Sequence, residues 1–224
     1  MKIETFTMKD LLTAGAHYGH IREKYNPKMA SFIFGLRDGL HLIDLEKTVV
    51  ALATALDFLI EAKKQGKMIL FVCTKAGMRE MVRETAESVG MPYVTERWPG
   101  GMLTNFTTLK KQIEKLRNLE AKIETPEFED LSKKDKSMMK KEIERLNKSF
   151  GGIKKLLKTP DILFVIDTIK EKTALAEAKT LKLPIVALVD TNSDPTVITY
   201  PVPMNDDAKK GIELVLGEMR EALK

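Results

Sequence analysis

The sequence has little cysteine and no long apolar segment. Cys73 is the only cysteine, which excludes an intramolecular disulfide and fits a reducing cytoplasm. The longest apolar runs, such as MILFVC and DILFVI, are too short to span a bilayer. The first ten residues contain no apolar h-region, so we expect neither a signal peptide nor a transit peptide. These absences argue against a disulfide-stapled secreted scaffold and against an integral membrane protein.

The chain also lacks an assembled set of catalytic groups. No histidine lies near Cys73 in the sequence, so we interpret this thiol as a buried bystander. The aspartates of VDTNSDP (189–195) resemble an acid/base or metal-binding pair, but turn chemistry explains them equally well. Lys75 and Arg79 follow a strand-like run and are placed to hold an anion, yet no G-x-G-x-x-G accompanies them. An α/β enzyme that binds a nucleotide or phosphorylated sugar near Lys75 and Asp190 is therefore only the second hypothesis, and no cofactor is expected.

Positive charge is concentrated in one segment. Residues 105–158 hold 15 Lys and Arg against 9 Asp and Glu, whereas the rest of the chain holds 22 against 23. The whole net charge of +5 therefore belongs to this segment. A polyanion-binding appendage would have this distribution, and so would a highly charged, solvated pair of helices.

Apolar patterning predicts an α/β body. Continuous apolar runs predict three buried strands, which alternate with helical patterns, as expected for a largely parallel sheet with helices on both faces. The strands are expected at 68–73, 161–166 and 184–190, with a short extended segment at 92–95. The helices are expected at 45–66, 78–90, 170–181 and 206–223, the last capped by Asp206 or Asp207. The first 45 residues show only turn signals and are predicted to be irregular.

Residues 105–150 interrupt this alternation. Phe106, Leu109, Ile113, Leu116 and Ile123 form one helical stripe, and Met139, Ile143, Leu146 and Phe150 form another. A polar turn lies between them, and Ser132 or Asp135 is placed to begin the second helix. The narrow apolar faces predict an antiparallel coiled-coil hairpin inserted into a body made of 1–104 and 151–224.

The segment AHYGHIREKYNPKM (16–29) combines basic and aromatic side chains around an Asn-Pro turn. Basic groups on an irregular loop can follow a phosphate backbone, and a tyrosine can stack on an unpaired base. Two other interpretations stay open. His17 and His20 can both be hydrogen-bonded structural residues, or they can share a metal ion with Asp190, Asp194, Asp206 or Asp207.

RWPGGMLTN (97–105) places an arginine, the only tryptophan and a glycine pair before the hairpin. The glycines permit close backbone approach, Arg97 can form a fork to phosphate, and Trp98 can stack on a base. A packed tryptophan beside a tight turn would give the same pattern.

Eight segments together resemble the bacterial form of the second ribosomal small-subunit protein family. They occur in the family's order over nearly the whole chain, which makes the resemblance specific. These segments are AHYGHIREKYNPKM, FIFGLRDGLHLIDLEKT (32–48), ILFVCTK (69–75), RWPGGMLTN, FGGIKKL (150–156), PDILFVID (160–167), PIVALVDTNSDP (184–195) and MNDDAKKGIEL (204–214). One departure is Pro99, where the family usually has leucine, so a backbone donor is lost there.

The resemblance implies a flavodoxin-like three-layer body with an inserted coiled-coil hairpin and no catalysis. It also implies a ribosome-bound, cytoplasmic protein that contacts small-subunit rRNA near the head–body junction and helps to dock the large mRNA-binding protein numbered first. No membrane and no small-molecule substrate are expected. The residues expected to contact RNA are Arg22, Lys24, Tyr25, Asn26, Lys28, Lys75, Arg97, Trp98, Asn105, Lys110 and Lys111.

Overall fold

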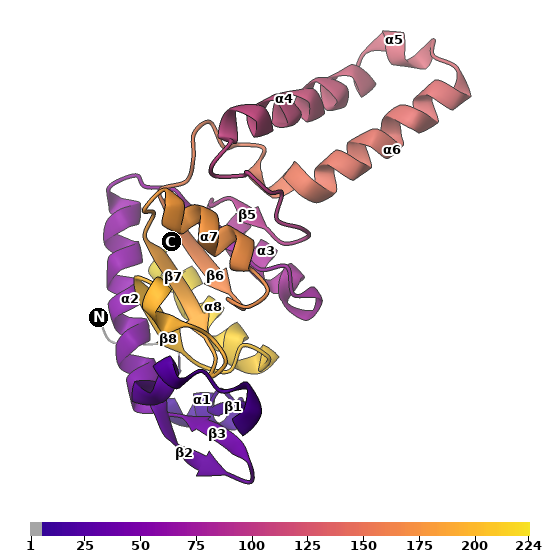
Figure 1. The fold of residues 1–224 in the computed structure, drawn as a ribbon. Coiled ribbons are helices and arrows are strands. Elements are labelled where there is room, and N and C mark those ends of the chain that lie inside the picture. Colours follow the sequence, from indigo (N-terminus) through magenta and orange to yellow (C-terminus); the bar gives the residue numbers. More distant parts are fainter. Residues whose placement is uncertain (1–5) are drawn as a thin grey trace.

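A five-stranded parallel sheet forms the centre of the body, in a computed structural model that describes residues 6–224 (Figure 1). The strand order is β5-β4-β6-β7-β8, which is the flavodoxin-like order 2-1-3-4-5 when these strands are counted along the chain. The predicted parallel sheet is therefore confirmed. The strands are β4 (Ile69–Val72), β5 (Tyr93–Val94), β6 (Ile162–Ile166), β7 (Ile185–Val189) and β8 (Tyr200–Pro203).

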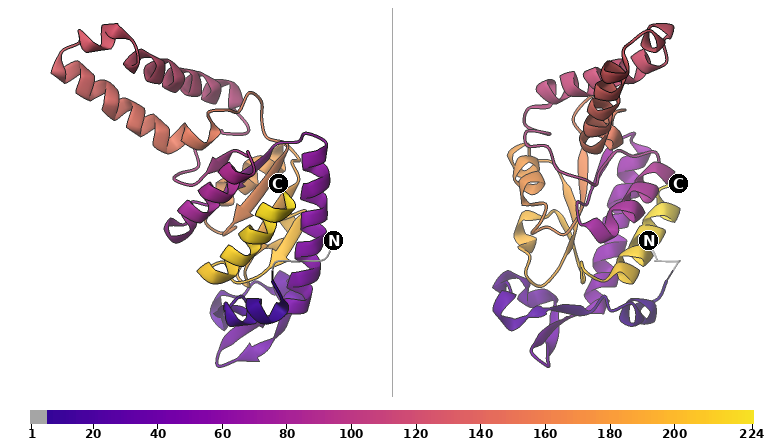
Figure 2. Two further views of the ribbon diagram at one scale, coloured as in Figure 1. Left: turned by 180° about the vertical axis from the view of Figure 1, so that it is seen from behind. Right: turned by 90° about the vertical axis from the view of Figure 1, so that its right-hand side faces the viewer.

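Helices cover both faces of the sheet, because alternate side chains of each strand point to opposite sides. Ile69 and Phe71 of β4 belong to one core, which is shared with α2, α3 and α8. Leu70 and Val72 belong to a second core, which is shared with α7. Figure 2 shows the resulting three layers edge-on. The helices are α2 (Leu45–Lys64), α3 (Arg79–Ser88), α7 (Lys172–Thr180) and α8 (Lys209–Ala222).

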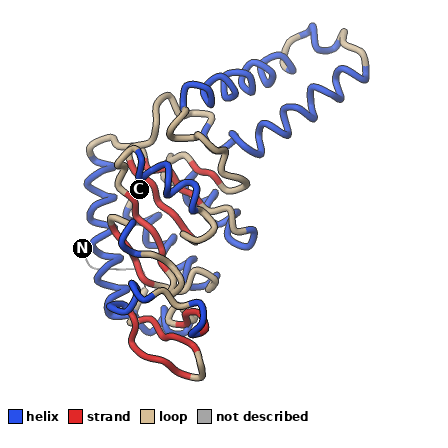
Figure 3. The backbone as a smooth tube through the Cα atoms, in the orientation of Figure 1, coloured by secondary structure: helices blue, strands red, loops and turns tan. Residues whose placement is uncertain are grey.

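The N-terminal region is not irregular, and that prediction is wrong. Helix α1 (Met8–Thr13) precedes an antiparallel sheet of order β1-β3-β2, at the end of the body opposite the hairpin (Figures 1 and 3). Bulges shift the register of both strand pairs, so the side chains do not alternate as a simple period-two pattern. Its strands are β1 (Tyr18–Ile21), β2 (Ile33–Arg37) and β3 (Leu40–Ile43).

Two details near the C-terminus also differ from the predictions. The fifth parallel strand, β8, was missed because it carries two prolines; it pairs only with β7, at the edge of the sheet, where proline is tolerated. Helix α8 begins at Lys209 with no side-chain cap. Asp206 and Asp207 therefore do not cap it, since their carboxylates contact Lys75 instead.

The hairpin leaves the body between β5 and β6 as two antiparallel helices (Figures 1 and 3). These are α4 (Phe106–Ile123) and α6 (Lys133–Phe150), joined by the short helix α5 (Pro126–Glu129). Ser132 caps α6, and Leu116 and Leu146 are fully buried between the helices. Leu109 of α4 belongs to the second core of the body, so the base of the hairpin is anchored there.

Within the described residues, no helix combines the length and apolarity needed to cross a membrane.

Candidate nucleic-acid interface

The basic N-terminal loop is fixed to the segment that follows β7. The backbone N–H of His20 donates to Thr191 Oγ1 at 2.7 Å, and the N–H of Asn26 donates to the carbonyl of Thr191 at 2.8 Å. Gly19 permits this approach, because a Cβ there would overlap the side chain of Thr191 and crowd the carbonyl of His41. AHYGHIREKYNPKM and VDTNSDP therefore form one unit, although they are far apart in the sequence.

The five predicted RNA contacts of this loop divide by exposure. Arg22 and Lys24 lie on an exposed 3-10 turn, and no ion pair holds either cation within the part of the chain that the structure describes. Tyr25 is half-buried and stacks on His41, with ring centroids 4.2 Å apart. Asn26 caps the next turn by accepting from the N–H of Lys28 at 3.1 Å.

Lys28 is paired rather than free. Its Nζ lies 2.5 Å from Asp194 Oδ2, and its side chain is about half exposed. The hydrogen bond from Lys28, together with those from Thr196, lowers the pKa of Asp194 to about 2. This pair fixes the end of the loop, so the unpaired charge of the loop belongs to Arg22 and Lys24.

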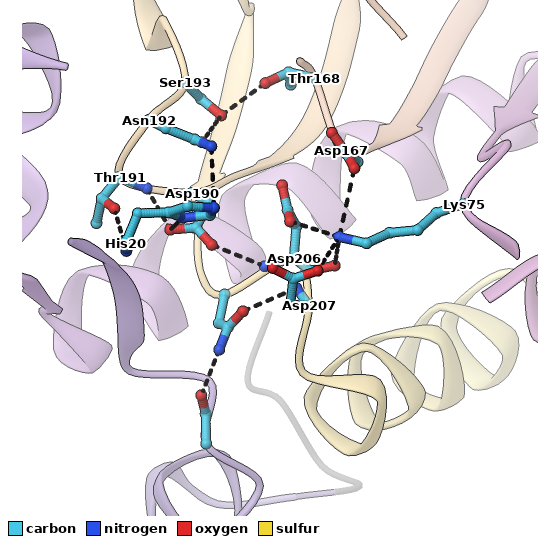
Figure 4. Close-up of polar contacts among 12 residues, drawn as sticks. His20, Lys75, Asp167, Thr168, Asp190, Thr191, Asn192, Ser193, Asp206 and Asp207 are labelled. Carbon is cyan, nitrogen blue, oxygen red and sulfur yellow. Dashed lines mark hydrogen bonds and ion pairs between the residues drawn. The ribbon is translucent and has the colours of Figure 1, made fainter. Parts of the chain in front are cut away.

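The two histidines of the loop point into different surroundings. His20 Nδ1 lies 3.2 Å from Asp190 Oδ1, and its Nε2 lies 3.2 Å from the side-chain nitrogen of Asn192 (Figure 4). The ring of His17 lies in a tilted arrangement against Tyr18, with centroids 4.0 Å apart, and His17 lines a groove beside α1. Among residues 6–224, no three His, Cys, Asp or Glu side chains are arranged to hold a metal ion. The structure therefore does not support the metal hypothesis.

The loop RWPGGMLTN is organised by a buried carboxylate. Glu177 of α7 accepts five hydrogen bonds from this loop, at 2.8–3.2 Å. Burial acts to raise the pKa of Glu177, but the hydrogen bonds outweigh it and the pKa is lowered. The donors are Trp98 Nε1, the backbone N–H groups of Gly101, Leu103 and Thr104, and Thr104 Oγ1.

This arrangement does not fit the predicted role of Trp98. The side chain is 8% exposed within the second core, and its indole N–H is committed to Glu177, so it offers no free ring face to a base. Arg97 and Asn105, by contrast, are exposed at the two ends of the loop. No hydrogen bond or ion pair engages the guanidinium of Arg97 within the described part of the chain.

Lys75 is engaged by three aspartates at the carboxyl ends of the strands (Figure 4). Its Nζ lies 2.5 Å from Asp207, 2.9 Å from Asp206 and 3.4 Å from Asp167. Burial acts to lower the pKa of Lys75, but the hydrogen bonds to Asp207 and Asp206 outweigh it and hold the pKa above its usual range. The prediction that Lys75 contacts RNA does not fit, because its charge is already neutralised inside the protein.

The same cluster fills the place where doubly wound folds bind ligands. Burial, with the charges of Asp167 and Asp190, raises the pKa of Asp206 to about 6. Arg79 is also engaged, because its guanidinium donates to Glu96 at 2.8 Å and to the carbonyl of Thr74 at 3.1 Å. Neither cation is available to an anionic substrate.

Lys110 and Lys111 are exposed on α4. No carboxylate lies within ion-pair distance of either side chain in the part of the chain that is described. Both therefore remain candidates for phosphate contact.

Sequence reasoning missed the two buried glutamates that shape the loops. Glu177 organises RWPGGMLTN, and Glu171 accepts from the N–H and hydroxyl of Thr74, both at 2.6 Å. Neither residue has a distinctive motif, since both occur among the charged and small residues of one helical segment. Only the tertiary fold shows their partners.

Comparison with known proteins finds one family of ribosomal proteins over nearly the whole chain. The family model described as Ribosomal protein S2 matches residues 11–224. A protein of Coprothermobacter proteolyticus named small ribosomal subunit protein uS2 is 46% identical over 97% of this chain and 81% of its own length. Proteins of the same name from Helicobacter hepaticus and Helicobacter acinonychis are 46% and 47% identical over 97% of this chain, and 82% and 88% of their own lengths are covered.

Proposed function

Because the chain belongs to the ribosomal protein S2 family, we propose that it is a structural, non-enzymatic constituent of the small ribosomal subunit that binds small-subunit rRNA. It acts in translation, bound to ribosomes in the cytoplasm. The family resemblance adds two finer proposals, a location near the head–body junction and docking of the large mRNA-binding first protein. The enzyme hypothesis is abandoned, since the family is structural and Lys75 is occupied by aspartates.

The main observation in support of RNA binding is that two cations of one fixed loop have no ion pair within the described residues. Arg22 and Lys24 are exposed, while the contacts of His20 and Asn26 with Thr191 hold the backbone of the same loop in place. A preorganised cationic loop loses little conformational entropy when it binds phosphates. The segment 97–105 and the hairpin lie toward the opposite end of the body (Figure 1), where Arg97, Asn105 and exposed lysines of the hairpin such as Lys111 form a second proposed contact region.

A charge-reversal experiment tests the role of the loop. Arg22→Glu with Lys24→Glu is expected to weaken binding of the full chain to purified small-subunit rRNA and to lower its share in small subunits on sucrose gradients. Neutralising phosphates releases counterions, so the salt dependence of binding is expected to become shallower by about 1.4–1.8, or about 0.7–0.9 for each lost phosphate contact.

Lys64→Glu with Lys67→Glu is the matched control, because both lysines are exposed and the charge change is the same. Equal loss in the two double variants would contradict a specific contact at the loop. Fractionation of the endogenous protein wholly away from ribosomes would contradict the proposed function itself.

Docking of the first protein requires a surface that suits a protein partner, and an apolar groove beside α1 is such a surface. A groove of about 490 Å³ runs between α1 and the β2–β3 hairpin. Its wall includes Phe34, which is 78% exposed, together with Met8 and Leu12, which are about half exposed. Exposed apolar side chains rimmed by charged residues are typical of protein–protein contacts.

Phe34→Ala tests this surface. The variant is expected to reduce co-purification of the large mRNA-binding protein with ribosomes while leaving incorporation of the variant itself unchanged. Val50→Ala, which removes an exposed apolar side chain of α2 outside the groove, is the control. Unchanged co-purification in the Phe34 variant would remove the groove from the docking proposal.

We also propose that residues 1–104 and 151–224 are one folding unit and that 105–150 is an insertion. The strand order supports this division, because β4 pairs with both β5 and β6 across the inserted segment.

A further inference from the structure

The two sides of the hairpin carry different charge. Residues 105–158 contain 15 cations and 9 carboxylates, but these counts do not show on which side of the hairpin each charge lies. Helical spacing and the ion pairs between α4 and α6 separate them into two surfaces.

One surface is defined by three cations on each helix. On α4, Lys111, Lys115 and Lys122 follow one another at intervals of four and seven, which places them in one stripe. On α6, Lys134, Lys141 and Arg145 have intervals of seven and four and form a second stripe.

Glu142 brings the two stripes together. Its carboxylate lies 2.6 Å from Lys115 Nζ on α4 and 2.7 Å from Arg145 Nε on α6. The hydrogen bonds from Arg145 and then Lys115 lower the pKa of Glu142 to about 2, so the bridge is charged at neutral pH. We call this surface the Glu142 face. Its six exposed cations accompany two carboxylates, the bridging Glu142 and Asp135, which lies seven residues before it and accepts from Ser132 Oγ at 2.6 Å. Four of the cations, Lys111, Lys122, Lys134 and Lys141, have no ion pair within the described residues.

The opposite side is centred on Glu120. Its carboxylate accepts from Asn147 at 2.9 Å and from Lys154 at 2.6 Å, so it lies on the other edge of the helix pair. Here cations alternate with carboxylates at helical spacing. We call this surface the Glu120 face; its cations include Lys110, Arg117, Lys133 and Lys140, and its carboxylates include Glu114, Glu120, Glu124 and Glu144.

Consecutive residues of a helix point about 100° apart, so Lys110 and Lys111 belong to different faces. The sequence predicts both lysines as RNA contacts, but only Lys111 lies on the Glu142 face. Their separation follows from the packing of Leu109, Ile113 and Leu116, which fixes the rotation of α4.

We propose that the Glu142 face is the surface through which the hairpin contacts the phosphate backbone of RNA, and that the Glu120 face is not. This assignment rests on the proposed rRNA binding. Lys111 to Lys122 extends over about 16 Å of helix, which is enough for several successive phosphates of one strand. Glu142 holds Lys115 and Arg145 at the centre of the surface, and the four unpaired lysines surround them.

The same face is poorly suited to a protein partner. Met138, which lies in the same stripe of α6 four residues after Lys134, is the only large apolar side chain that is exposed in residues 106–150, so the face has no apolar core. Stable protein interfaces have an apolar core that is depleted of lysine, whereas protein–nucleic acid interfaces are polar and strongly positive. The chemistry of the Glu142 face therefore favours a polyanion over a folded protein.

Two double variants of the full chain test the assignment. Lys111→Glu with Lys141→Glu alters the Glu142 face, and Lys110→Glu with Lys133→Glu alters the Glu120 face. Each pair takes one exposed lysine without an ion pair from each helix, and each changes the charge by the same amount. Thermal melting of both variants reports whether the fold is retained.

The probe is purified small-subunit rRNA, with filter binding at several salt concentrations. The Glu142-face variant is expected to lose affinity and to show a salt dependence shallower by about 1.4–1.8, while the Glu120-face variant keeps the unmodified behaviour. Lys111→Arg with Lys141→Arg keeps the charge and is expected to retain binding. Equal effects of the two charge reversals, or binding of the Glu142 face to an acidic protein instead of RNA, would overturn the assignment.

The loop variant Arg22→Glu with Lys24→Glu distinguishes failure of the face assignment from failure of the proposed rRNA binding. If that variant loses rRNA binding while both hairpin variants keep it, the face assignment fails and the proposed function stands. If none of the three variants changes binding, the proposed rRNA contacts fail as a whole.

Discussion

The indole N–H of Trp98 donates to Glu177 Oε1 at 3.0 Å, although the two residues are 79 positions apart. Four further donors of the same loop surround this carboxylate. A protein carboxylate therefore occupies the cradle of N–H groups that a glycine-rich loop often offers to a phosphate. The contact joins α7 to the segment that leads into the hairpin.

Glu177→Gln is expected to destabilise the protein by about 2–3 kcal/mol in urea unfolding. All five partners donate, and a glutamine presents an amide nitrogen where one carboxylate oxygen now accepts, which leaves buried donors unsatisfied. Lys179→Gln, on the exposed side of the same helix, is the control and is expected to have an effect below about 0.5 kcal/mol. A Glu177→Gln variant as stable as the unmodified protein would contradict this account.

Sequence patterns predicted the parts of the fold that depend on local periodicity. The strands from Ile69 and Ile162 were found because each is a continuous apolar run, and the hairpin helices were found from their apolar stripes. The N-terminal sheet was missed because its strands are short and bulged, and because Phe34 leaves its apolar side chain exposed. A period-two pattern cannot identify such strands.

The candidate interface was predictable only in part, because burial depends on distant residues. Arg22 and Lys24 lie exposed, as a basic loop should, but the partners of Lys75 come from the ends of two other strands. The sequence could not show that Asp206 approaches Lys75 across 131 positions. The sequence motifs therefore identify basic and aromatic side chains, but they do not show which of those side chains are exposed to a partner.

The cluster around Lys75 makes the stability of the protein depend on pH. The pKa of Asp206 is about 6 in the folded protein and 3.8 as its ordinary value, so the folded state binds more protons between about pH 4 and pH 6. The stabilisation linked to this proton is therefore complete below about pH 4 and is lost as the pH rises through about 6. One pKa unit corresponds to about 1.4 kcal/mol, so the whole effect is a few kcal/mol at most.

Asp206→Asn removes this titration. The free energy of unfolding of the unmodified protein, minus that of the variant, is expected to fall as the pH rises from 4 to 7. Urea unfolding at several pH values measures the difference, in which groups distant from Asp206 cancel and the coupled groups Lys75, Asp167 and Asp190 do not. Asp130→Asn, which removes an exposed carboxylate at the hairpin tip, is the matched control. Parallel pH profiles for Asp206→Asn and the unmodified protein would rule out this linkage.

The contact between the base of the hairpin and the body depends on Gly152. Gly152 lies so close to Tyr93 that a Cβ there would overlap both the carbonyl and the ring, whereas a Cβ at Gly100 would meet no atom within 4 Å. Gly152→Ala is therefore expected to destabilise the protein by about 1–3 kcal/mol, since the backbone carbonyl cannot move aside cheaply. Gly100→Ala is expected to be neutral or slightly stabilising. Thermal unfolding distinguishes the two, and similar melting temperatures would show that the hairpin base adapts.

Arg97 and Trp98 are neighbours in the sequence, but their substitution by alanine is expected to affect different properties, rRNA binding for Arg97 and stability for Trp98. Arg97 is exposed and unpaired among the described residues, so Arg97→Ala should weaken rRNA binding and leave the melting temperature unchanged. Trp98 is packed in the second core, so Trp98→Ala should cost about 3–5 kcal/mol of stability. The decisive measurement is rRNA affinity per folded molecule, which should fall for Arg97→Ala and stay unchanged for Trp98→Ala wherever that variant is folded. A loss of affinity in a fully folded Trp98 variant whose loop keeps its position would restore the stacking role that its burial argues against, since Arg97 would still be presented as before.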